Sequence, residues 1–263
     1  MRISQAGHVY ELLNERERAW ATYQSMLLLA KRMNITMLIS IALSQLAMLS
    51  WHEIFDVQEQ AQMLFQEEIG HVDDRTILAE NVWQLTQFSF YRFDADAALQ
   101  HGKQALYLAR EPGFPELIAR VRSALASAFM LDNAWAEAEA LAEEARIFYE
   151  RQHNPVMEAT CLVQIAQVSY TRGQPQESII ATRAAHLAFT QAEYSWGRIY
   201  SAYHLIAGLL DIGAYEEALL TAEEALALAR IYNTALLICL CLTALGRVRR
   251  ALMDPSGAYA LHN

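Results

Sequence analysis

The 263-residue chain contains few of the residues that interrupt helices. It has only 10 Gly and 5 Pro, whereas 54% of its residues are hydrophobic, many of them Ala and Leu. Sandwiches, barrels and doubly wound sheets need regular Gly, Pro or Asn turns and β-branched runs, so this scarcity disfavours them. The composition predicts an almost wholly helical, all-α chain.

Cysteines and long apolar runs are also scarce. The three Cys are an odd number, and Cys239 and Cys241 stand two positions apart, which on a helix directs their side chains about 200° apart. They therefore cannot share one metal ion, and we predict that Cys161, Cys239 and Cys241 are buried, reduced thiols in a cytoplasmic protein. The longest apolar stretch, residues 234–245, is too short and too mixed to span a bilayer, and the N-terminus lacks a signal-peptide pattern.

Positive charge is the minority, since the formal net charge is −10 at pH 7. This balance disfavours binding to phosphate backbones. The chain has no G-x-x-x-x-G-K-[ST] loop and no basic helix-turn-helix segment. We therefore expect no direct binding of nucleic acid or membrane and no cofactor.

A period of 40 residues runs through the chain. Ala98, Ala138, Ser178, Ala218 and Ala258 are spaced at this interval. Further columns with the same interval are Ala105, Ala145, Ala185 and Ala225, and Leu85, Leu125, Ile165, Leu205 and Leu245. Prolines follow the period too: Pro115 and Pro155 are 40 apart, and Pro175 and Pro255 are 80 apart. Because proline is tolerated in the first helical turn, these residues indicate two helix starts per repeat.

Each repeat is therefore predicted to be a pair of helices joined by short turns. The first helices are expected over residues 2–13, 37–51, 76–92, 115–131, 156–172, 196–212 and 235–252. The second helices are expected over 15–33, 57–69, 95–111, 134–152, 175–192, 214–232 and from 256 onward. In residues 216–230, Ala218, Ala222, Ala225 and Ala229 form a small-residue contact stripe, and pairs of Glu form a solvated back.

These columns resemble the tetratricopeptide (TPR) pattern, over essentially the whole chain. Repeat six has the expected order of apolar, apolar–small and Ala positions: Ala202, Leu205, Ile206, Leu209, Ala218, Ala222 and Ala225. Repeat four follows it with Leu125, Ala126 and Phe129, but Arg122 departs from the large apolar position. The resemblance implies a right-handed α-solenoid of about six and a half helix-turn-helix repeats.

The repeat length departs from the ordinary TPR, which is about 34 residues long. Longer repeats whose second helix reads like Ala222–Arg230 resemble the MalT-like TPR sensor region of LuxR-type (STAND) bacterial transcriptional regulators. In that family the superhelix binds an inducer or an inhibitory protein, and other domains bind ATP and DNA.

The ends of the chain lack polar capping helices, which solenoids normally need. We therefore expect one superhelical domain, residues 1–263, that is a fragment of a longer protein. The alternative is a naturally short protein that forms homo-oligomers through its uncapped ends.

The resemblance places the first helices on an inner, concave wall. The inward positions combine aromatic rings with fixed polar groups, which suits a sugar, a peptide or a partner helix. The alternative is that Trp83, Tyr170 and Tyr203 only fill the space between repeats. The candidate binding residues are Trp51, Trp83, Gln87, Tyr91, Arg120, Gln167, Tyr170, Tyr200, Tyr203 and Arg247.

Catalytic and metal sites are not indicated. None of the eight His belongs to an H-E-x-x-H pattern, and no G-x-S-x-G is present. His204 is expected to be a core or groove histidine, and Asp73 and Asp74 are expected to cap a helix.

Three functions compete at this point. The first is a non-enzymatic domain of a signalling or transcription regulator that senses a small-molecule inducer or a protein partner. The second is a generic protein–protein interaction scaffold that binds a peptide or helix. The third, an enzyme, is disfavoured because no acid, base or nucleophile cluster is evident.

Overall fold

The computed structural model describes residues 6–7, 9–10, 15–33, 35, 38–39, 41–42, 45–46, 75–110, 114–232 and 235–253. Within these residues the secondary structure is helical, with no strand. The predicted helices over 2–13, 37–51 and 57–69 and from 256 onward lie wholly or mostly outside the described residues, as do Asp73 and Asp74.

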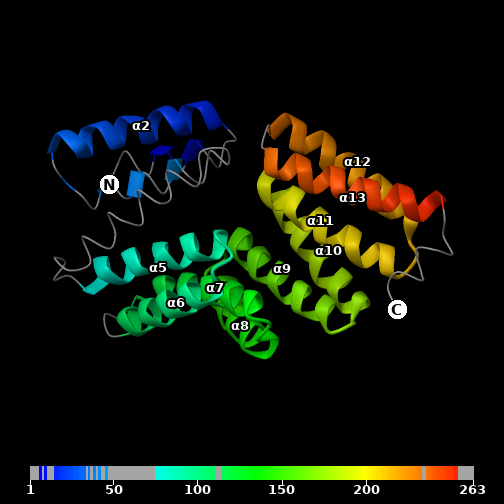
Figure 1. The fold of residues 1–263 in the computed structure, drawn as a ribbon, viewed down its shortest axis with the longest axis horizontal. Helices are drawn as coiled ribbons and strands as arrows, with labels where there is room; N and C mark the ends of the chain where they lie inside the picture. The colour runs from blue at the N-terminus through cyan, green and yellow to red at the C-terminus, as the bar shows by residue number, and fades with distance from the viewer. Residues whose placement is uncertain are drawn as a thin grey trace. The chain divides into compact units, whose positions relative to one another are not determined.

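The chain divides into two compact units, residues 1–134 and 135–263. The first unit contains the helices α2 (Arg16–Met33), α5 (Arg75–Tyr91), α6 (Ala95–Arg110) and α7 (Pro115–Leu131). The second contains α8 (Trp135–Arg151), α9 (Pro155–Thr171), α10 (Pro175–Gln191), α11 (Ser195–Asp211), α12 (Tyr215–Tyr232) and α13 (Ala235–Met253) (Figure 1).

Within each unit, consecutive helices pack against each other, and first helices also contact the first helices of the next repeat. Thus α5 contacts both α6 and α7, and α11 contacts α9, α10, α12 and α13. This order of contacts is typical of a TPR-like solenoid, so the predicted all-α repeat fold is confirmed.

The 40-residue period arises because each repeat is two copies of a 20-residue module, a helix of about 17 residues and a three-residue turn. In the turns that the structure describes in full, the middle residue has a positive φ, between 53° and 76°: Phe93, Asn133, His153, Gly173, Glu193 and Gly213. After α9, the Gly173 N–H donates to the Tyr170 carbonyl and the Gln174 N–H to the Ser169 carbonyl, each at 3.0 Å. This is the Schellman arrangement, which satisfies the last carbonyls of a helix.

The starts of the helices follow the sequence signals. Pro115, Pro155 and Pro175 each occupy the first turn of a helix. The Asn154 side chain accepts a hydrogen bond from the Met157 N–H at 3.1 Å, and the Asp94 carboxylate accepts one from the Ala97 N–H at 3.0 Å. Both contacts cap otherwise unpaired N–H groups.

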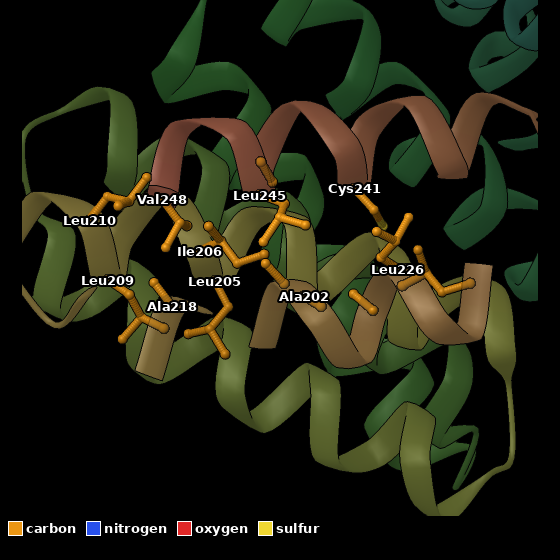
Figure 2. Close-up of a cluster of buried hydrophobic side chains, with 14 of the residues drawn as sticks. Ala202, Leu205, Ile206, Leu209, Leu210, Ala218, Leu226, Cys241, Leu245 and Val248 are labelled. Atoms are coloured by element: carbon orange, nitrogen blue, oxygen red, sulfur yellow. The ribbon is translucent and has the colours of Figure 1, made fainter. Parts of the chain in front are cut away.

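The core between α11, α12 and α13 is built from the repeat columns (Figure 2). Leu205, Ile206 and Leu209 of α11 point toward small and medium-sized side chains of the other two helices. All four Ala of the predicted α12 contact stripe are buried: Ala218, Ala222, Ala225 and Ala229. The absence of larger side chains there lets the helix axes approach closely.

One prediction about burial needs correction. Cys161 and Cys241 are buried, but Cys239 is exposed, because a residue two positions from the core-facing Cys241 lies on the opposite side of α13. Ile165 is only partly buried, whereas Leu85, Leu125, Leu205 and Leu245 of the same column are buried.

Candidate functional site

The predicted binding residues of the second unit lie on the first helices α9, α11 and α13. With further side chains they form two groups on these helices, one around Gln167 and one around Tyr170, here named together the aromatic–polar cluster. Its members are Gln167, Tyr170, Trp196, Tyr200, Tyr203, His204, Asp211 and Arg247.

The centre of the cluster is the Gln167 side chain of α9. Its Nε2 donates a hydrogen bond to the Tyr200 hydroxyl at 3.0 Å and lies 2.6 Å from Nε2 of His204. An amide nitrogen can only donate, so His204 Nε2 accepts and the ring carries its proton on Nδ1. The two hydrogen bonds tie α9 to α11 across consecutive repeats.

In the aromatic part of the cluster, Trp196, Tyr200 and His204 follow α11 at intervals of four residues, which places them on one helix face, and Tyr203 lies beside His204. The Trp196 and Tyr200 rings are stacked, with centroids 4.7 Å apart and an interplanar angle of 20°. The Tyr200 and Tyr203 rings both meet His204 edge-on, at 4.7 Å and 5.2 Å. These rings form a continuous, partly exposed aromatic surface.

Burial controls the ionisation of the central groups. It lowers the pKa of His204 to about 4, and it raises the pKa of the Tyr200 hydroxyl above its ordinary value. Both side chains are therefore neutral at pH 7, and the centre of the cluster presents hydrogen-bonding groups without charge.

The charged part of the cluster surrounds Tyr170 near the end of α9. Burial raises the pKa of the Tyr170 hydroxyl, the Asp211 carboxylate adds to this by its charge and hydrogen bond, and Arg247 opposes it. Side chains from α9, α11 and α13 thus meet at one hydroxyl. The structure thus brings the candidate residues Tyr170 and Arg247 together.

In the first unit, Trp83 and Arg120 are also brought together. The Arg120 guanidinium lies over the Trp83 ring, 4.9 Å from its centroid, and is paired with the Glu80 carboxylate at 2.5 Å. Glu80 and Arg120 occupy equivalent positions of neighbouring repeats, 40 residues apart. The contact combines an ion pair with a cation–π interaction.

The other predicted binding residues are not joined to these groups by a described contact. Gln87 is partly exposed on α5. Tyr91 ends α5, but its side chain lies outside the described residues, as does the whole of Trp51.

Sequence reasoning left Trp196 and Asp211 out of the site and placed His204 between core and surface. A signal for two of them was present, since Trp196, Tyr200 and His204 are spaced by four on one predicted helix. Asp211 ends α11, and no spacing rule connects it to Tyr170 of another repeat.

No group of three His, Cys, Asp or Glu side chains in the described part of the chain is arranged to hold a metal ion. None of the described helices is long and apolar enough to cross a membrane.

No protein-family model matches the chain, and no curated protein matches it. Solved structures with a similar fold include BtubC from P. vanneervenii, with a TM-score of 0.63 and 18% identity over 83% of this chain and 92% of that one. A STAND protein with a tetratricopeptide repeat sensor from Pyrococcus horikoshii has a TM-score of 0.70 and 14% identity, over 95% of this chain and 37% of that one.

A Rap protein complexed with competence and sporulation factor has a TM-score of 0.63 and 11% identity, over 98% of this chain and 91% of that one. The chain therefore has a TPR-like helical-repeat fold, as predicted. It spans little more than a third of the STAND protein's length.

Proposed function

We propose that the chain is a non-enzymatic, single-domain binding module, residues 1–263, within a bacterial signalling or transcription regulator. Its aromatic–polar cluster recognises a small-molecule inducer or a protein partner. The observation that carries the proposal is the Gln167 carboxamide, which connects Tyr200 and His204 of the next repeat on a partly exposed face.

The chemistry of the cluster suits recognition of an uncharged or weakly charged ligand. In the pairing described, Gln167 Nε2 and His204 Nε2 are engaged with each other, which leaves the Gln167 oxygen as an acceptor and the His204 Nδ1–H and Tyr200 O–H as donors. The neighbouring Trp196 and Tyr203 rings supply apolar surface. Fixed polar groups beside aromatic rings are typical of binding sites for small molecules and peptides.

The similar structures support a regulatory role. One is a STAND protein whose repeats are described as a sensor, and another is a Rap protein in complex with competence and sporulation factor. The name of the first protein connects the fold with signal transduction, and the second protein holds a bound factor. The same fold is compatible with the second candidate, a scaffold for protein–protein assembly.

The test measures thermal unfolding of the chain with a panel of oligosaccharides and metabolites. We expect one compound to raise the unfolding temperature by an amount that grows with its concentration. The variant Gln167→Ala is expected to weaken binding about tenfold, since an uncompensated hydrogen-bonding group costs about 1–3 kcal/mol. Gln176→Ala is the matched control, because Gln176 is exposed near the start of the second helix α10.

A second arm distinguishes the scaffold. A defined protein partner whose binding is lost in Gln167→Ala and Tyr203→Ala, with no response to any compound, would favour a protein partner over a small-molecule inducer. Binding that neither variant changes would show that the aromatic–polar cluster is not the recognition site.

A further inference from the structure

The outer faces of the second helices α10 and α12 expose large apolar side chains that the fold does not need. Ile180 of α10 is 69% exposed and Leu220 of α12 is 63% exposed. The two residues are 40 positions apart and so are equivalent in consecutive repeats, whereas the earlier repeats place Gln100 and Ala140 there. The repeat therefore folds with a polar or a small residue at this position, and a large apolar one is not required.

Further apolar side chains extend this surface along both helices. Leu187 follows Ile180 by seven residues, with the exposed Ala184 between them, and Ile231 follows Leu220 by eleven. These intervals return to nearly the same side of a helix. Ile180, Leu187, Leu220 and Ile231, here named the outer stripe, thus lie on the solvent side of α10 and α12, away from the buried Ala218 and Ala222 of the core.

The charges beside the outer stripe are mainly negative. The exposed ionisable residues of α10 and α12 comprise five acidic and two basic side chains: Glu177, Glu216, Glu217, Glu223, Glu224, Arg183 and Arg230. Arg183 is paired with Glu217, and Arg249 of α13 lies 3.8 Å from Glu223. Glu177, Glu216 and Glu224 make no ion pair with any described residue, so their charge is available to a partner.

We propose that the outer stripe binds an amphipathic helix of another protein, whose apolar side is flanked by Lys and Arg. A partner helix with apolar side chains at intervals of three, four or seven residues would present one apolar side to the outer stripe. Basic residues on either side of it would complement the carboxylates that make no ion pair with a described residue. A second copy of this chain is a poor occupant, because the same face of the copy would bring like charges together. An anionic lipid surface is disfavoured for the same reason.

The experiment uses a fluorescent peptide of about 16 residues, roughly four helical turns, with Leu along one side and Lys on both flanks. A control peptide carries Glu in place of Lys. Fluorescence anisotropy with the full chain is expected to give micromolar binding for the Lys peptide, as is usual for a small interface, and binding at least tenfold weaker for the Glu peptide.

Variants locate the site. Ile180→Gln and Leu220→Gln are each expected to weaken binding of the Lys peptide about tenfold, because each removes apolar surface from the interface. Leu28→Gln, at an exposed apolar side chain of α2, is the matched control and should leave affinity unchanged. Circular dichroism checks that each variant keeps its helical content.

Several results would overturn the proposal. They are no binding of the Lys peptide, equal binding of the two peptides, or affinity unaffected by Ile180→Gln and Leu220→Gln. Loss of affinity in Gln167→Ala alone would assign the peptide to the aromatic–polar cluster instead. A dimer that sedimentation detects in the wild type and not in Leu220→Gln would replace the foreign helix with a second copy.

Discussion

Nε2 of Gln167 lies 2.6 Å from Nε2 of His204, although the two residues are 37 positions apart and belong to different repeats. The contact requires a neutral imidazole, because a proton on His204 Nε2 would face the N–H groups of the carboxamide. Burial acts in the same direction and lowers the pKa of His204 to about 4. The link between α9 and α11 is therefore sensitive to acid.

Acid should weaken the fold in a defined pH window. In the unfolded chain His204 titrates near its ordinary pKa of 6.5, and in the folded chain near 4, so below pH 6.5 the unfolded state binds more protons. The stabilisation from neutral His204 is complete above about pH 6.5 and is lost as the pH falls toward 4. We expect a loss of about 1–3 kcal/mol in the free energy of unfolding, measured with urea at a series of pH values.

The variant His204→Gln separates this residue from the other histidines. Burial also lowers the pKa values of His101 and His186, which contact Ser89 and Ser201. Because His101 and His186 are still present in His204→Gln, we expect the variant's free energy of unfolding to keep a weaker dependence on pH. A slope between pH 6.5 and 4 that is equal in the variant and the wild type would contradict the role assigned to His204.

The Glu80–Arg120 ion pair should show measurable but modest coupling. Both side chains are partly exposed, so solvent screens the pair, yet the Trp83 ring beneath Arg120 restricts the guanidinium. A double-mutant cycle with Glu80→Gln and Arg120→Met is expected to give a coupling energy of about 0.5–1 kcal/mol in urea unfolding, which falls as salt is added. A coupling energy below about 0.2 kcal/mol would mean that the two side chains lie close together without stabilising the fold.

The helices could be predicted closely from the sequence because their limits are set locally. The predicted ranges 115–131, 175–192 and 214–232 differ from α7, α10 and α12 by no more than one residue at either end. Proline at a helix start and a small residue at each crossing restrict the chain strongly at those points. The 20-residue module is not evident from the sequence, because Phe93, His153 and Glu193 occupy turn positions that sequence rules assign to Gly or Asn.

The side-chain contacts of the candidate site were less predictable. Periodicity placed Gln167 and Tyr200 on the same kind of helix face, but the register between α9 and α11 decides that they meet. That register depends on how the core columns interdigitate, which one sequence does not specify. Asp211 illustrates the limit, since its contact with Tyr170 depends on three helices together.

The turns allow a direct test of backbone strain. Glu193 has φ 54°, a left-handed conformation that costs an ordinary side chain about 1 kcal/mol, whereas the equivalent Gly173 adopts φ 75°. Glu193→Gly should therefore raise the free energy of unfolding by about 0.5–1 kcal/mol. Gly173→Ala should lower it by a similar amount, although no atom lies within 4 Å of the added methyl group. Opposite signs in urea unfolding would be the confirming result, and equal signs the contradicting one.

Phe189 and Gly197 are matched in size across the contact between α10 and α11. A methyl group on Gly197 would lie 2.4 Å from the Phe189 ring, whereas the equivalent positions of the following repeat hold Ala229 and Leu237 in one core cluster. Gly197→Ala should therefore overpack the core and cost about 1–3 kcal/mol. Gly246→Ala is the control: nothing lies within 4 Å there, so better helix propensity should stabilise the chain by about 0.5–1 kcal/mol.

The size match also predicts rescue. Phe189→Ala alone should lower the free energy of unfolding by about 3–5 kcal/mol, because it leaves a cavity. Gly197→Leu alone should lower it by at least as much as Phe189→Ala, because the leucine clashes with the Phe189 ring. Together the two changes reproduce the Ala and Leu of the next repeat, so the leucine fills the space that the ring leaves. The double variant is expected to unfold with a free energy at least 2 kcal/mol higher than the sum of the single effects implies. Additive losses would mean that the two positions are not packed against each other and that the small residue at 197 has another cause.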